Sequence, residues 1–142
     1  MRISEESVDA WLDSLDDERA DEFRRLDRLI SDVFAGDSRV LWVGKFWGGT
    51  DQTIVGYGDL IQPRPKGEDV HWFVVGLALQ KANISLYVNA VKDGSYLGQA
   101  YSKSLGKVKV GSASIGFRSL ADLNMEALAS MLDEARSIIR LP

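Results

Sequence analysis

Helical patterns at both ends of this chain enclose a middle of strand-like segments, an order that leaves few folds open. Near the N-terminus, apolar residues recur at i, i+3, i+4 and i+7, the spacing of one helix face: Val8, Trp11, Leu12 and Leu15. A second stripe consists of Phe23, Leu26, Leu29, Ile30, Val33 and Phe34. A third consists of Met125, Leu128, Met131, Leu132, Ala135, Ile138 and Ile139. The stripes predict two N-terminal helices and one C-terminal helix.

Capping residues indicate where these helices begin and end. We expect Ser4 to cap the first helix, Asp16 or Asp17 the second, and Asn124 the last, because these side chains accept hydrogen bonds from free backbone amides. Gly36 follows the second stripe and is the expected stop signal of that helix.

The middle of the chain has the alternation and the turn residues of an antiparallel sheet. The expected strands are Arg39 to Trp47, Gln52 to Ile61, Val70 to Leu79, Ile84 to Ala90 and Ala113 to Phe117. Val70 to Leu79 is apolar on both faces, which predicts a central strand covered on both sides. A short helix within Ser95 to Ser104 is also compatible with the pattern. We therefore predict one α+β domain over residues 1–142, with about five antiparallel strands and the C-terminal helix packed on the sheet.

Composition limits the class of protein further. The chain has no cysteine, which excludes disulfides, thiol nucleophiles and thiolate metal sites. No apolar run approaches the ~20 residues of a membrane span, and the N-terminus turns acidic at once instead of resembling a signal peptide. We expect a cytoplasmic protein that binds no membrane.

Charge is distributed unevenly along the chain. Residues 1–37 carry twelve acids and five bases, residues 38–118 five acids and ten bases, and residues 119–142 four acids and two bases. A basic middle is compatible with lysines on a solvated sheet or with a positively charged binding surface. The excess is small for a nucleic-acid-binding protein, which needs a clustered basic stripe. We expect no nucleic-acid partner.

Familiar catalytic motifs are missing. His71 is the single histidine, so a catalytic triad or a histidine-based zinc site would depend on it alone. Its position before an apolar run favours a hydrogen-bonded structural role. Lys107 follows Gly106, but the Ser or Thr and the first glycine of a P-loop are missing. The sequence favours a protein that is not an enzyme but does not exclude one, and it gives no indication of a cofactor.

Two clusters of charged residues are candidate sites. The basic one has Lys107 and Lys109 between Gly106 and Gly111, with Lys81 as a further cation. If 107–110 is extended, both lysines point to one side, and the glycines let backbone amides approach an anion. The alternative is an edge strand that its lysines protect from aggregation.

The acidic cluster surrounds the junction of the two N-terminal helices. Its members are Asp13, Asp16, Asp17, Asp21 and Glu22. Carboxylate oxygens bind hard cations, so weak metal binding is one hypothesis. The alternative is helix capping together with solvated charge.

Three phrases resemble the YdhG-like family of bacterial domains, one branch of which is labelled a frataxin-like iron chaperone. They are Val8 to Leu12, Val75 to Lys81 with Ile84 to Tyr87, and Leu105 to Gly111 leading to Ser119 to Leu123. The resemblance implies an α+β domain with an antiparallel sheet, and the iron-chaperone label would direct attention to the acidic cluster.

Together these observations predict a non-enzymatic binding module. Its expected partner is a small anionic ligand, or an acidic protein surface, at Lys107, Lys109 and Lys81. The alternatives are iron or other metal binding by the acidic cluster, and a protein–protein interaction module that uses exposed aromatic residues.

Overall fold

The structure, a computed structural model, describes residues 1–45, 49–62 and 66–140. Its α-helices are α1 (Val8–Asp13), α2 (Ala20–Val33), α3 (Leu97–Ala100) and α4 (Met125–Arg140), with a 3₁₀ turn η1 (Leu120–Asp122). Its longer strands are β2 (Arg39–Lys45), β3 (Asp51–Tyr57), β6 (Val75–Leu79), β7 (Ile84–Val88) and β11 (Ser114–Phe117). Its short strands are β1 (Arg2–Ile3), β4 (Leu60–Gln62), β5 (Val70–Trp72), β8 (Val91–Lys92), β9 (Ser95–Tyr96) and β10 (Lys109–Val110). The predicted α+β class is confirmed.

The main sheet has seven strands in the order β1-β2-β3-β6-β7-β11-β10, and all neighbours are antiparallel. The prediction of about five strands was therefore too low for the described residues. The described α-helices exceed the three main predicted helices by α3, which lies in the segment Ser95 to Ser104 where the pattern was compatible with a short helix. The strands β1 and β10 at the two edges have only two residues each, too few for a recognisable alternation. Two small hairpins, β4–β5 and β8–β9, lie outside the main sheet.

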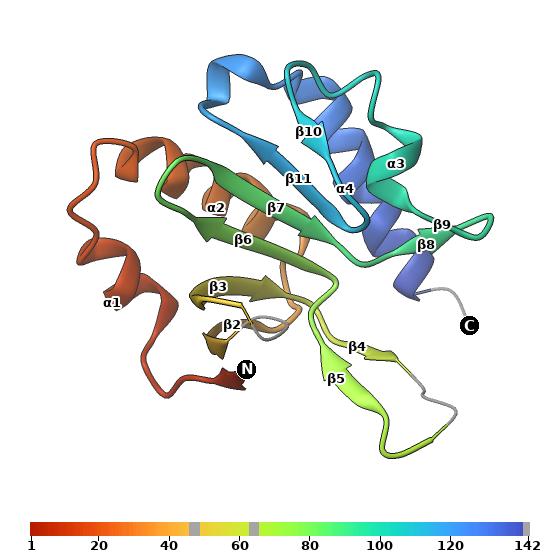
Figure 1. The fold of residues 1–142 in the computed structure, drawn as a ribbon, viewed down its shortest axis with the longest axis horizontal. Helices are drawn as coiled ribbons and strands as arrows, with labels where there is room; N and C mark the ends of the chain where they lie inside the picture. The colour runs from red at the N-terminus through yellow and green to blue at the C-terminus, as the bar shows by residue number, and fades with distance from the viewer. Residues whose placement is uncertain (46–48, 63–65, 141–142) are drawn as a thin grey trace.

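Helices cover one face of the sheet. Figure 1 shows α2 and α4 behind the strands. Most residues of both predicted stripes are buried or half-buried, with the exception of Met125, which is exposed. The core on this face includes Phe23, Leu26 and Ile30 of α2, Leu77 and Leu86 of the sheet, and Met131 and Leu132 of α4. No helix of the described residues has the length and apolar character needed to cross a bilayer.

Aromatic rings cover part of the opposite face. Phe73, at 1% exposure, joins Ile54, Ala78 and Tyr87 in a second, smaller cluster. A Cβ on Gly76 would overlap the Phe73 ring, so this glycine leaves the space that the ring occupies. Burying side chains this size stabilises a fold by about 1.5–3 kcal/mol each.

The predicted strand from Val70 to Leu79 is broken in the structure. Its first part is β5, which pairs with β4, and its second part is β6 in the main sheet. The expected strand from Gln52 to Ile61 is divided in the same way into β3 and β4, around Gly58 with a φ of 75°. The break between β5 and β6 consists of the apolar residues Phe73 and Val74, which explains why the pattern suggested a single strand there. The break between β3 and β4 consists of Gly58 and Asp59. The predicted end of the first strand, at residues 46–47, lies outside the described residues.

Two of the expected helix caps were wrong. Ser7, rather than Ser4, accepts the hydrogen bond from the Ala10 amide at the start of α1. The N-cap position of α2 is Arg19, which makes no side-chain cap, while Asp17 accepts from the Arg19 amide at 2.8 Å.

Asn124 caps α4 as predicted. Its Oδ1 accepts hydrogen bonds of 3.1 Å from the amides of Glu126 and Ala127. We expect Asn124→Ala to lower the free energy of unfolding by about 1 kcal/mol because these amides lose their acceptor. Urea denaturation of Asn124→Ser, which keeps a capping oxygen, is the matched control. Equal losses in the two variants would show that the cap is not the cause.

Candidate anion-binding site

A depression lies on the face of the sheet opposite the helices, over β7, β11 and β10. It has a volume of about 760 Å³, and we call it the basic depression. Its lining residues are Asn83, Ser85, Gly106, Lys107, Val108, Lys109, Gly111, Ser114, Gly116, Phe117, Arg118 and Asp122. It thus unites four of the five ligand-binding residues predicted from the sequence.

The register of three strands fixes how the basic depression is built. Lys109 of β10 lies opposite Gly116 of β11, which in turn lies opposite Ser85 of β7. Directly opposed residues share one face of a sheet, so Lys109 and Ser85 flank a position without a side chain. Lys107 precedes β10 rather than belonging to it, and Arg118 follows β11.

Lys81, the fifth predicted residue, lies at the neighbouring turn between β6 and β7. It lines an adjacent depression of about 590 Å³ together with Trp11, residues 50–53 and residues 79–83. Asn83 lines both depressions. Lys81 therefore flanks the basic depression across Asn83 and contributes its charge from outside.

The cations around the basic depression make no ion pairs within the described part of the chain. Lys81, Lys107, Lys109 and Arg118 are all exposed, and none of them shares a salt bridge with a described carboxylate. In contrast, four other cations form ion pairs with aspartates: Arg19, Arg24, Arg39 and Arg136. The charge of the basic depression is thus available to a ligand.

The two glycines have backbone roles different from the amide cradle expected from the sequence. Gly106 has a φ of 106°, and a Cβ there would overlap the carbonyl oxygen of Asp122. The Lys107 amide donates to that same oxygen at 2.8 Å, and the Gly111 amide donates to Ser114 at 2.8 Å. These two amides therefore already have acceptors within the chain, and the side chains are the clearest groups for binding an anion in this depression.

A hydrogen-bond network fixes the polar side of the basic depression. Ser85 Oγ donates to Gln80 Oε1 at 2.5 Å, and Gln80 Nε2 donates to Tyr87 and Gln52, each at 3.2 Å. Gln80 thereby contacts all three side chains through its amide. The Ser85 hydroxyl donates its single proton in this bond, so toward any other group its oxygen acts as an acceptor.

The acidic cluster is divided among separate contacts. Asp17 pairs with Arg19, whose hydrogen bonds lower the pKa of the Asp17 carboxyl, and Asp21 pairs with Arg24. Glu22 accepts a hydrogen bond of 3.0 Å from the amide of Leu120. Asp13 and Asp16 are exposed. Over the described ranges, no three His, Cys, Asp or Glu side chains are placed to hold a metal ion.

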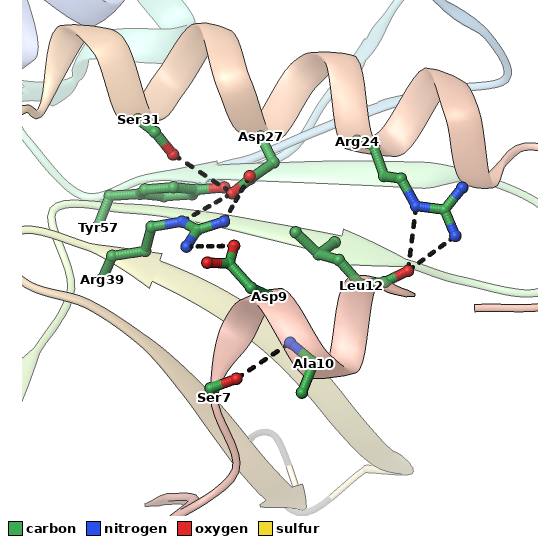
Figure 2. A network of polar contacts seen from close by, with 9 residues as sticks. All are labelled: Ser7, Asp9, Ala10, Leu12, Arg24, Asp27, Ser31, Arg39 and Tyr57. Carbon is green, nitrogen blue, oxygen red and sulfur yellow. Dashed lines mark hydrogen bonds and ion pairs between the residues drawn. The ribbon is translucent and has the colours of Figure 1, made fainter. Parts of the chain in front are cut away.

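A buried ionic network, absent from our sequence-based expectations, connects α2 with the sheet. Asp27, at 4% exposure, accepts hydrogen bonds from Arg39 at 2.6 and 3.1 Å and from the Tyr57 hydroxyl at 2.6 Å (Figure 2). Arg39 also bonds Asp9 of α1 at 3.0 Å. The signal in the sequence was a charge inside an apolar stripe, because Asp27 lies four residues after Phe23.

This network controls the ionisation of its members. Burial raises the pKa of the Tyr57 hydroxyl well above its usual value, and the Asp27 charge raises it further. Burial alone would lower the pKa of Arg39, but hydrogen bonds and the charges of Asp27 and Asp9 outweigh that effect and raise it. Tyr57 thus stays neutral and Arg39 charged, and the network holds α1 and α2 on the sheet.

Sequence reasoning also missed several lining residues: Asn83, Ser85, Ser114 and Arg118. Their segments are far apart in the chain, so no local motif joins them. His71, expected to be a hydrogen-bonded structural residue, is exposed in β5.

Comparison of the chain with protein-family models, curated proteins and solved structures gives no match. The resemblance to the YdhG-like family therefore stays a prediction.

Proposed function

We propose that this protein is a binding module whose basic depression binds a small anionic ligand. The observation that supports this most is a set of cations around one hollow, Lys107, Lys109 and Arg118, that form no ion pair with any described residue. Its volume of about 760 Å³ lies within the range of roughly 300–1,000 Å³ usual for small-molecule pockets.

The proposed affinity arises from several modest attractions. Each cation is exposed, so water and salt screen its interaction with an anion. Lysine and arginine N–H groups form charge-assisted hydrogen bonds to phosphate and carboxylate, which are stronger than neutral ones. Binding should therefore weaken as ionic strength rises. Such a site holds and orients an anion, consistent with a binding module that is not an enzyme.

We expect the double variant Lys107→Ala/Lys109→Ala to bind inorganic phosphate about tenfold more weakly than the unmodified protein. The reason is that the variant lacks two of the three cations that line the basic depression. Phosphate titration followed by NMR measures this loss. The matched control is Lys66→Ala/Lys103→Ala, which removes the same charge from exposed lysines outside the basic depression. Equal weakening in both variants would show that only net charge matters and would contradict the proposal.

The edge-strand alternative makes a different prediction for the same variant. β10 is an edge strand, and Lys109 is exposed on it. If the lysines serve only to prevent pairing between sheet edges, the double variant will aggregate more readily than the unmodified protein. Its affinity for phosphate will then equal that of the unmodified protein. Light scattering alongside the titration separates the two roles.

The other two functional hypotheses gain no comparable support. In the acidic cluster, Asp17, Asp21 and Glu22 each contact a different partner, and Asp13 and Asp16 are exposed. The aromatic residues Trp42 and Trp72 are half-buried against the sheet, with ring centroids 4.9 Å apart, rather than fully presented to a partner.

A further inference from the structure

We propose that the ligand of the basic depression is a phosphorylated polyhydroxy compound, the class to which sugar phosphates belong. This inference rests on the proposed anion-binding function and adds a second requirement. The ligand must bring hydroxyl donors as well as negative charge, because the depression contains groups that only accept hydrogen bonds.

Ser85 is the first such group. Its Oγ donates its single proton to Gln80 Oε1 at 2.5 Å, so toward the depression this oxygen only accepts. In this arrangement Gln80 Nε2 donates to Gln52 Oε1 and to the Tyr87 hydroxyl, and Oε1 is the atom that faces Ser85. Near neutral pH the phosphate group of a phosphate monoester is mainly a dianion with no proton to offer Ser85, whereas a ligand hydroxyl has one.

Asp122 is the second acceptor. Asp122 belongs to η1 and is one of the residues that line the basic depression beside the cations. No described cation forms a salt bridge with it. An ionised carboxylate repels a bare anion but accepts hydrogen bonds from hydroxyl groups. A ligand that carries both phosphate and hydroxyl groups satisfies both sides of this arrangement.

The remaining lining favours the same class. Asn83 and Ser114 offer an amide and a hydroxyl. The only aromatic residue among the described lining residues is Phe117, which is 4% exposed and faces the core. A ring suitable for stacking a nucleotide base is thus missing from this part of the molecule, and Val108 is the only aliphatic residue among the described lining residues.

The spacing suits a ligand larger than phosphate. Lys109 and Ser85 share a face two strands apart, a separation of about 10 Å at the usual strand spacing. A phosphate group held near Lys107 and Lys109 can therefore leave its hydroxyl-bearing body over Gly116, where no side chain intervenes. The body then reaches Ser85.

The test compares three probes on the full chain: inorganic phosphate, glucose 6-phosphate and hexyl phosphate. We expect calorimetry to show glucose 6-phosphate binding about tenfold more tightly than phosphate, since two acceptors gain partners. Hexyl phosphate should bind no more tightly than phosphate. Ser85→Ala should remove most of the gain for the sugar phosphate, so that this variant binds glucose 6-phosphate and phosphate with similar affinity. Ser112→Ala, an exposed serine in the β10–β11 turn, is the matched control.

A second variant tests Asp122, and it keeps the inference testable if Ser85→Ala does not fold. Asp122→Asn should strengthen phosphate binding, because a repulsive charge is gone, while reducing the advantage of glucose 6-phosphate over phosphate. Thermal unfolding and the NMR spectrum of each variant show whether it is folded.

The outcomes separate this inference from the proposed function. Suppose that phosphate binding depends on Lys107 and Lys109. If glucose 6-phosphate then binds no more tightly than phosphate, or if its tighter binding does not depend on Ser85, the polyhydroxy class is wrong and anion binding stands. Tighter binding of hexyl phosphate than of glucose 6-phosphate also overturns the inference. If neither phosphate nor glucose 6-phosphate binds through the lysines, the proposed function itself fails.

Discussion

Asp27→Ala will lower the free energy of unfolding by about 3–5 kcal/mol, because it leaves a buried partner charge without compensation. Asp27 is 4% exposed and accepts hydrogen bonds from Arg39 and Tyr57. Without the carboxylate, the Arg39 guanidinium keeps only its bond to the exposed Asp9. The Tyr57 hydroxyl loses the acceptor seen in Figure 2. Urea denaturation followed by circular dichroism measures the loss.

Two further variants identify the cause. Asp32→Ala removes an exposed carboxylate from the same helix and should change the stability by no more than about 0.5 kcal/mol. The triple variant Asp27→Leu/Arg39→Met/Tyr57→Phe removes all three polar partners together and should recover most of the stability, as buried ion pairs often tolerate apolar replacement. A triple variant as unstable as Asp27→Ala would mean that packing, rather than the unpaired charge, dominates.

Gly106→Ala will destabilise the fold by about 3 kcal/mol, through left-handed backbone strain and a steric overlap together. Gly106 has a φ of 106°, and its missing Cβ leaves room for the carbonyl of Asp122. That carbonyl accepts the hydrogen bond of the Lys107 amide, while the Asn124 amide bonds Leu105. The same substitution should therefore weaken phosphate binding as well as stability. Denaturation and phosphate titration on one sample measure both.

Gly94→Ala is the control for strain alone. Gly94 has a φ of 82°, but no atom lies within 4 Å of the position its Cβ would take. It should cost about 1 kcal/mol, the strain of one left-handed residue, and leave phosphate binding intact. If both variants lose equal stability, the close approach of residues 106 and 122 does not hold the basic depression in place.

The helices were predicted well from the sequence, because apolar periodicity and capping residues are local properties of the chain. The stripe from Phe23 to Phe34 becomes the buried face of α2, and Asn124 caps α4. Strands were harder to predict because β5 and β6 form one apolar run in the sequence but pair with different strands, β4 and β3. Phe73 packs against the space left by Gly76, which a pattern of apolar residues cannot show.

The candidate site was predicted in part. Lys107 and Lys109 stood out because two glycines flank them, and both line the basic depression. Ser85, Arg118 and Asp122 come from other segments, and only the pairing of β7, β11 and β10 brings them together. The role of Gly106 was misjudged for the same reason, since its neighbour Asp122 is distant along the chain.

By itself, the sequence determined the α+β class, the positions of the main helices and the charge of the middle segment, because periodicity and charge are local properties of the chain. The tertiary structure decided which charges are neutralised. It pairs Asp27 with Arg39 in the interior and leaves Lys107, Lys109 and Arg118 unpaired around a hollow within the described residues. That division depends on strand order and helix packing, which bring distant residues within hydrogen-bond reach or keep them apart.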